Sequence, residues 1–331
     1  MSDQFIGIDV GGTKIACATL EAGELSDSHL QHTALDSQER LLEQLVGAVD
    51  HVRTAEARAV GIGVPSLIEF ETGRIRSSVN IPLEDVPLRQ LLTERIGLPV
   101  YVENDASCAA LAEAFRDGRM AVPHLVMFTV GTGVGGGLVL NGRLYRGATG
   151  TASEVGHTLI GLNLEHGAPP HSGVFPQAGS LEVLASGRAL DKLAEDAAKQ
   201  DANSFLGKRL TREGGVTGHD AVDGAGEGDE ASIRCLRILG ERLGIGIANA
   251  ITMFDPLEIV IGGGVSAAGE LLLGPARDTA WKYAVPGAGS KCEIRLARHG
   301  PRAGVLGAAL LAAQEYTQDT GVEMEEAVEG R

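Results

Sequence analysis

The residues whose types and spacing are best suited to chemistry follow the first apolar run of the chain. The segment FIGIDVGGTKIACATL (residues 5–20) stops being apolar at Asp9, crosses Gly11 and Gly12, and becomes apolar again after Lys14. This pattern predicts a β-hairpin whose glycine turn lets the backbone approach another molecule closely. Backbone N–H groups in such turns can bind phosphate oxygens without interference from a Cβ atom.

Two further strand-like segments end in glycine turns, at residues 131–137 and 262–264. Each turn alone is typical of an ordinary hairpin, but three of them in one α/β chain favour a phosphate-binding site. The sequence contains no G-x-x-x-x-G-K-[ST] motif. The letters GTGVGG fit the pattern G-x-G-x-x-G, but the following GLVLNGRLY is strand-like, so we reject a dinucleotide site.

The elements that must position these turns alternate between strand and helix, which is typical of a layered α/β fold. Residues 124–147 repeat the pattern of residues 4–26 (strand, glycine–threonine turn, strand), so we expect two similar domains. A Gly- and acid-rich stretch at 221–232 predicts a surface loop. The other predicted strands lie at 59–65, 99–105 and 256–266, and the predicted helices at 38–56, 85–97, 106–115, 233–254 and 303–316.

Composition limits the classes of function. The net charge of −16 disfavours nucleic-acid binding, which needs a concentrated basic surface. The four cysteines form no C-x-x-C pair, the N-terminus has no basic leader, and no apolar run is long enough to span a membrane. We therefore expect a cytoplasmic protein with no membrane partner. The 46 glycines have no regular period, and we expect them mainly in tight turns.

Four segments resemble the signature segments of the ROK family of sugar kinases, in the actin-like, hexokinase-like ATPase superfamily. They are IGIDVGGTKI, VENDASCAALAE, TVGTGVGGGLVLNGRLYRGATGTASEVGH and IVIGGGVS, and the resemblance extends from about residue 5 to 316. It implies an α/β fold of two actin-like (ribonuclease H-like) domains with a cleft between them. We expect one domain over 1–120, completed by the helix at 303–316, a second over 121–302, and a disordered acidic tail over 317–331.

The resemblance also implies roles for individual residues. Asp105 matches the catalytic base that orients the sugar hydroxyl and takes its proton; alternatively, Asn104 or Asp105 simply caps the following helix. Asp9 would help position the magnesium of MgATP. The residues implied to bind phosphate or adenosine are Gly11, Gly12, Thr13, Lys14, Thr132, Gly133, Gly263 and Gly264. Those implied to bind sugar, together with Asp105, are Asn80, Asn104, Glu154, His157 and Glu182.

The sequence departs from the family pattern at a structural zinc site. Many relatives hold zinc with the counterpart of His157 and three cysteines, but this chain has His171, Phe175 and Ser180 at the cysteine positions. Only His157 and His171 remain as matching ligands, whereas tetrahedral zinc needs four. We therefore expect no zinc, and packing around Phe175 in its place.

The expected activity is transfer of phosphate from ATP to a hexose, with glucose as the first candidate. Mannose, fructose, N-acetylglucosamine and N-acetylmannosamine remain alternative acceptors, and polyphosphate an alternative donor. A non-catalytic sugar sensor is an alternative of another class. A DNA-binding repressor is disfavoured because the first strand begins at Phe5 and the charge is acidic. The resemblance also implies a homodimer or higher homo-oligomer.

Overall fold

The computed structural model describes residues 3–78, 80–170 and 173–321. The chain divides into two compact units. The first consists of Met1–Pro123, Gly137–Ser153 and Arg298–Arg331, and the second of His124–Gly136 and Glu154–Ala297. The sequence had placed all of 121–302 in one domain, but Gly137–Ser153 belongs to the first unit. The reason is local packing, because a Cβ atom at Gly137 would lie only 2.9 Å from the carbonyl oxygen of Ala106.

The first unit is built on a sheet with strand order β3-β2-β1-β5-β8, with β4 beside β2. β1 pairs antiparallel with β2, as the glycine hairpin predicted, and β1, β5 and β8 run parallel. A small hairpin, β6–β7, follows β5. The elements of this unit are β1 (Gln4–Val10), β2 (Lys14–Glu21), β3 (Glu24–Leu25), β4 (His29–His32), α1 (Gln38–Val52), β5 (Ala57–Val64), β6 (Ser66–Glu69), β7 (Arg74–Ser78), α2 (Leu88–Ile96), β8 (Val100–Asn104), α3 (Asp105–Ala114), β9 (Phe115–Arg116), β10 (Arg119–Met120), β13 (Arg143–Leu144) and α10 (Ala303–Thr320).

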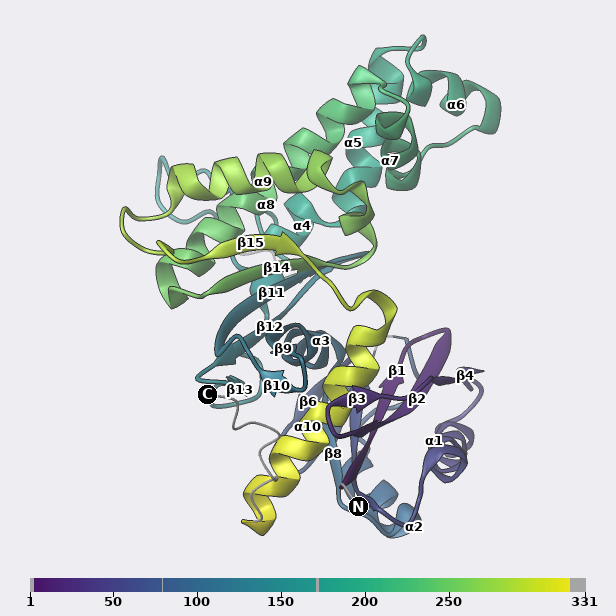
Figure 1. Ribbon diagram of the computed structural model, residues 1–331. Helices are drawn as coiled ribbons and strands as arrows, with labels where there is room; N and C mark the ends of the chain where they lie inside the picture. The colour runs from purple at the N-terminus through teal and green to yellow at the C-terminus, as the bar shows by residue number, and fades with distance from the viewer. Residues whose placement is uncertain (1–2, 79, 171–172, 322–331) are drawn as a thin grey trace. The chain divides into compact units, whose positions relative to one another are not determined.

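The helices α10 and α3 pack against the first sheet and against each other (Figure 1). This packing depends on glycine. A Cβ atom at Gly7 of β1 or Gly61 of β5 would collide with the α10 backbone, and one at Gly307 of α10 would collide with the carbonyl of Cys108 in α3. Several glycines therefore permit close approach of backbones, whereas the sequence had predicted mainly turns. Leucines of α1, including Leu41, Leu42 and Leu45, pack with the sheet in a separate apolar cluster.

The helix α10 is longer than predicted, and it includes residues that were expected to belong to the disordered tail. It continues to Thr320 and ends at Gly321, whose φ of 66° is left-handed. Within its last turn the Asp319 carboxylate accepts a hydrogen bond from the Tyr101 hydroxyl at 2.8 Å. The prediction of a disordered tail from 317 is therefore wrong for residues 317–320, and the remainder, 322–331, lies outside the described residues.

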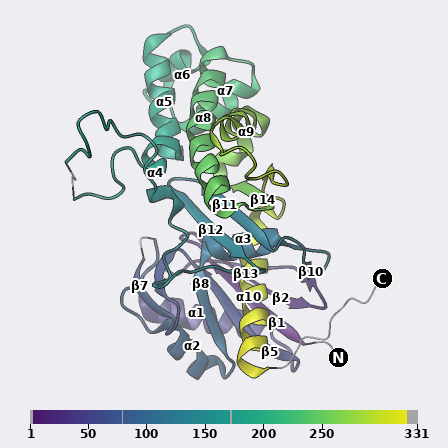
Figure 2. The ribbon, with the colours of Figure 1, turned by 90° about the vertical axis from the view of Figure 1, so that its left-hand side faces the viewer.

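The second sheet has the strand order β13-β12-β11-β14-β15. Strands β11, β14 and β15, which run parallel, belong to the second unit, as does the start of β12. Figure 1 shows α8 and α9 side by side near β14 and β15, and Figure 2 shows α5, α6 and α7 gathered around α8. The chain passes between the units within β12. The elements are β11 (His124–Val130), β12 (Val134–Leu140), α4 (Leu181–Ala185), α5 (Gly187–Gln200), α6 (Phe205–Glu213), α7 (Gly218–Gly226), α8 (Glu230–Phe254), β14 (Glu258–Gly262), α9 (Glu270–Tyr283) and β15 (Glu293–Leu296).

One predicted loop is a helix. Residues 221–226 of the predicted 221–232 loop belong to α7, and α8 begins at Glu230. A capping box starts α7: the Asp220 carboxylate accepts hydrogen bonds from both the backbone N–H and the hydroxyl of Thr217. Gly224 faces Ser232 and Phe205 with no room for a side chain, so packing against its neighbours stabilises this glycine-rich helix.

Across the part of the chain that the structure describes, no helix combines the length and the apolar character needed to cross a membrane.

Candidate active site

Two acidic side chains lie at the carboxyl edge of the first sheet. Asp9 is the second-to-last residue of β1, and Asp105 directly follows β8 as the first residue of α3. Because β1, β5 and β8 are parallel neighbours, their carboxyl ends share one edge, where ligands bind in open α/β sheets. The pKa of Asp9 is raised to about 6, chiefly by burial and then by the charge of Asp105, and Lys14 opposes the shift. The two carboxylates therefore interact electrostatically.

The N-cap of α3 is Asn104, the residue before Asp105. The Asn104 side-chain oxygen accepts hydrogen bonds from the backbone N–H groups of Ala106 and Ser107, at 3.0 and 3.3 Å, and so caps α3. Asp105 Oδ1 accepts a hydrogen bond from Ala106 N at 2.8 Å. Burial raises the pKa of Asp105, and the Ala106 N–H partly offsets this effect. Since Asn104 already caps the helix, Asp105 is not needed for that purpose.

The glycine turn after Asp9 is held by its neighbours. Gly11 N donates to the Lys14 carbonyl at 2.9 Å, and the Thr33 hydroxyl donates to the Gly11 carbonyl at 2.7 Å. A Cβ atom at Gly12 would lie 3.0 Å from Cβ of Asn80, so Asn80 packs directly against the turn. Thr13 and Lys14 are exposed, which leaves the tip of the hairpin accessible to a ligand.

Local sequence patterns do not indicate which residues lie over Asp9. A Cβ atom at Gly304, in the first turn of α10, would lie 2.5 Å from Cγ of Asp9. The N-terminus of α10 therefore packs against this carboxylate, and a helix N-terminus favours a negative charge. Only the run of small residues AGVLGAALLAA could have suggested such close packing, and it does not identify the partner.

In the second unit, the turn between β11 and β12 contains Thr132 and Gly133. The turn closes through a hydrogen bond from Gly131 N to the Gly133 carbonyl at 2.9 Å, and Gly187 N donates to the Gly131 carbonyl at 2.7 Å. Thr132 is exposed at its tip. This geometry is compatible with a phosphate loop in which backbone groups meet the ligand.

Gly263 and Gly264 follow β14, beside the end of β11. Gly263 has φ of 85°, and any Cβ atom there would collide with the backbone of Val130. Gly264 has no heavy atom within 4 Å of the position its Cβ would take. The first glycine is therefore required by the fold, whereas the second offers a bare backbone surface.

The predicted sugar ligands are divided between the units. Asn80 and Asn104 belong to the first, and Glu154, His157 and Glu182 belong to the second. Within the second unit, Glu154 Oε2 lies 3.7 Å from His157 Nε2. Glu182 has a contact that the sequence did not predict: its Oε2 accepts a hydrogen bond from Val134 N at 2.9 Å, and the carboxylate packs against Gly133. Glu182 thus holds the second glycine turn.

The region of the lost zinc ligands differs in part from expectation. Ser180 is buried, and its hydroxyl accepts a hydrogen bond from Val183 N, which caps α4. Phe175 is 66% exposed and meets His157 only edge-on, with ring centroids 6.0 Å apart. The prediction that packing around Phe175 replaces zinc is therefore wrong, because an exposed ring forms no core. His171 lies outside the described residues.

Sequence reasoning also missed Glu103 and Arg146, which form a largely buried ion pair directly beside Asn104, with 2.6 Å between Glu103 Oε2 and Arg146 Nε. The segment YVEND (residues 101–105) ends in three polar residues, and only the last two, Asn104 and Asp105, have a predicted role. Glu103 is predicted only as part of the strand.

The chain resembles known proteins over nearly its whole length. A model of the ROK family matches residues 5–315. A glucokinase of Halalkalibacterium halodurans is 36% identical, covering 98% of this chain and 100% of that protein. An N-acetyl-D-glucosamine kinase of Pasteurella multocida is 33% identical over 92% of this chain and 98% of that one. The crystal structure of a ROK family glucokinase from Streptomyces griseus, in complex with glucose and AMPPNP, has a TM-score of 0.74 at 32% identity, covering 94% and 99% of the two chains.

The fold is thus that of an α/β sugar kinase. The chain belongs to the ROK family, as the resemblance of its signature segments had indicated.

Proposed function

We propose that this protein is an ATP-dependent hexose kinase of the glucokinase type, which transfers the γ-phosphoryl group of MgATP to the 6-hydroxyl of D-glucose. The observation that carries the proposal is the pair of carboxylates, Asp9 and Asp105, at the edge of the sheet beside a glycine turn. The full-length similarity to a glucokinase supports it.

Asp105 would act as the general base. Burial raises its pKa, so the carboxylate holds a proton more strongly than an exposed aspartate does. A base with that property is better suited to take the proton of the attacking hydroxyl as the new bond to phosphorus forms. The neighbouring Asn104 uses its side-chain oxygen to cap α3, so its NH2 group remains to donate a hydrogen bond to a sugar oxygen.

The donor phosphates would meet backbone and cationic groups. Gly11, Gly12 and Thr13 would approach the β- and γ-phosphates, and Lys14, which already lowers the pKa of Asp9, would lie beside them. Asp9 would interact with the magnesium that ATP carries, because a cation offsets the repulsion between the two carboxylates. The turn at Thr132 and Gly133 would form the second phosphate loop, and Gly263 and Gly264 would contact the adenosine.

Glucose is the first candidate among acceptors, and the similarity to an N-acetyl-D-glucosamine kinase makes an N-acetylhexosamine the second. Glu154, His157 and Glu182 would contribute hydroxyl-binding groups. We further propose closure of the two units around the substrates, which would exclude water from the transfer. A cytoplasmic homodimer or larger homo-oligomer, with ATP preferred over polyphosphate, completes the proposal.

The decisive experiment measures ADP release on a panel of hexoses, with the wild-type protein and the Asp105→Ala variant. We expect wild-type turnover with glucose, and a loss of about 100- to 10,000-fold in kcat for the variant. Glucose binding, measured by calorimetry, should survive because Asn104 still caps α3. Asp36→Ala, which removes an exposed carboxylate paired with Arg40, is the matched control. Glucose binding by the wild type without ADP release would instead identify a sensor.

A further inference from the structure

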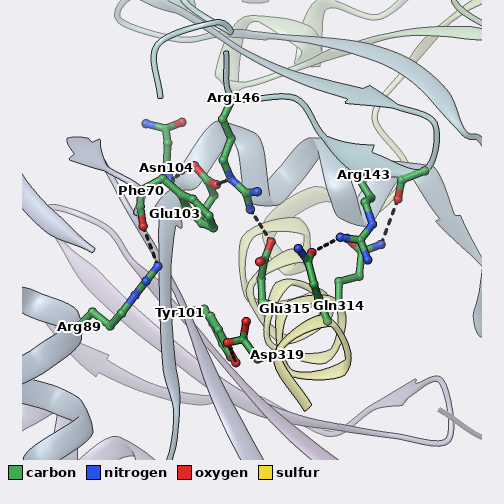
Figure 3. Close-up of polar contacts among 12 residues, drawn as sticks. Phe70, Arg89, Tyr101, Glu103, Asn104, Arg143, Arg146, Gln314, Glu315 and Asp319 are labelled. Atoms are coloured by element: carbon green, nitrogen blue, oxygen red, sulfur yellow. Dashed lines mark hydrogen bonds and ion pairs between the residues drawn. The ribbon is translucent and has the colours of Figure 1, made fainter. Parts of the chain in front are cut away.

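A largely buried arginine connects the predicted catalytic corner, at the end of β8, to two other parts of the first unit. Arg146 follows β13, and its side chain is 19% exposed. Its Nε donates to Glu103 Oε2 at 2.6 Å, and its Nη2 donates to Glu315 Oε1 of α10 at 2.9 Å (Figure 3). The guanidinium also lies over the Phe70 ring, 3.4 Å from its centroid. One planar group therefore joins β8, α10 and the tip of the β6–β7 hairpin.

The Glu103–Arg146 ion pair is connected to Asp105 by a hydrogen bond to the backbone of Asn104, the residue before it. Glu103 is 5% exposed, and its two carboxylate oxygens have different partners. Oε2 binds Arg146, while Oε1 accepts a hydrogen bond from Asn104 N at 2.9 Å. The orientation of the Glu103 carboxylate therefore fixes the peptide group that directly precedes Asn104 and Asp105.

We propose that Arg146 is a positioning residue for phosphoryl transfer: by holding Glu103 it fixes the backbone from which Asn104 and Asp105 project. This inference rests on the proposed kinase function. Displacement of a reacting group by about 1 Å can cost roughly 100-fold in rate. Without its guanidinium partner, the buried Glu103 carboxylate would be left uncompensated and would turn toward water. The Asn104 N–H would then lose its acceptor.

Lysine cannot replace Arg146 in this role. Two carboxylates on different elements bind two different nitrogens of one rigid, planar guanidinium. An ammonium group is a point charge on a flexible stem, without that fork geometry. Arg146 also forms part of the wall of a pocket of about 740 Å³, between residues 67–71 and 144–151. A shorter or neutral side chain at this position therefore borders open space and does not overfill a packed interior.

The chain offers two matched controls. Arg143, three residues earlier, also binds α10, through Gln318, but it has no contact with Glu103. Tyr101, two residues before Glu103 on β8, donates its hydroxyl hydrogen to Asp319 of α10. Figure 3 shows both near α10. Arg143→Met and Tyr101→Phe therefore remove neighbouring links to α10 and leave the Asn104 N–H bond intact.

The test compares Arg146→Met, Arg146→Lys and Glu103→Gln with these controls. We expect kcat to fall by about 10- to 100-fold in Arg146→Met and Arg146→Lys, with the KM for ATP unchanged within about twofold. Glu103→Gln should lose less, because its amide oxygen can still accept from Asn104 N. Both controls should keep wild-type kcat. Amide hydrogen exchange, measured on every variant without substrate, should accelerate at residues 104–107 in the two Arg146 variants alone.

The outcomes separate the inference from the proposed function. Wild-type kcat in folded Arg146→Met, or an equal loss in Arg143→Met, would overturn the positioning role while the kinase function stands. Absence of hexose-dependent ADP release by the wild type would overturn the kinase function, and with it the inference. If Arg146→Met does not fold, unchanged kcat and exchange in Arg146→Lys would overturn the proposal, and slower turnover with faster exchange would support it.

Discussion

Replacing Asp9 with asparagine should make the ligand-free protein more stable at neutral pH. The folded structure raises the pKa of this carboxyl from 3.8 to about 6, chiefly by burial. A raised pKa means that the folded state binds the proton more tightly than the unfolded chain does. The folded state therefore loses stability as pH rises from about 4 to about 6, and the full penalty, about 3 kcal/mol, is present above that range.

Asparagine has nearly the same shape and carries no charge, so the variant avoids this penalty. The difference in free energy of unfolding between Asp9→Asn and the wild type should be small at about pH 4 and approach 3 kcal/mol at about pH 7.5. Urea unfolding at both pH values, without nucleotide or magnesium, measures it. Asp36→Asn is the control, because the Asp36 side chain is 60% exposed.

The charge of Asp105 contributes to the shift at Asp9, which gives a second test of the same reasoning. Asp105→Asn should also stabilise the protein, and the double variant should gain less than the two single gains together, because each substitution already removes their repulsion. A stability difference for Asp9→Asn that does not change with pH would refute the electrostatic explanation. So would a net loss of stability at neutral pH.

Two further substitutions test the second unit. Glu182→Ala should raise the KM for ATP by about tenfold, because the glycine turn loses the acceptor for Val134 N. Glu182→Gln should change this KM less, because its amide oxygen can still accept the hydrogen bond. An effect confined to the KM for sugar would contradict this role. Gly263→Ala should destabilise the protein by about 3 kcal/mol or more in urea unfolding, because φ is 85° and the new Cβ atom meets the Val130 backbone. Gly264→Ala, in open space, is its control, and equal losses would contradict the argument.

Much of the fold followed from local patterns. The hairpin β1–β2 was predictable because two glycines separate two apolar strands, and its strands pair in register from Gln4 to Val10. Strands β5 and β8 and helices α1, α2 and α3 also lie where the alternation of apolar segments predicted them, with ends that differ by a few residues. Such elements owe their character to residues within a few positions of one another.

The errors arose where distant residues decide the structure. Helix α7 contains glycines that disfavour a helix locally, but Gly224 packs against Ser232 and Phe205. The last turn of α10 is polar, and Tyr101 on β8 provides a partner for its Asp319. Arg146 and Glu103 are 43 residues apart, so neither side chain predicts the other. Apolar periodicity carries no information on such polar partners.

The same limit applies to the glycines, and it bears on the candidate site. Gly7, Gly61 and Gly307 have no side chain because β1, β5 and α3 approach α10 at backbone distance. This approach places Gly304, in the first turn of α10, directly against the Asp9 carboxylate. The helix N-terminus favours the charge that burial disfavours, so the carboxylate is held in place and remains able to ionise. The close packing of small residues is therefore part of the site, because a bulkier interface would move α10 away from Asp9 and leave its charge without this support.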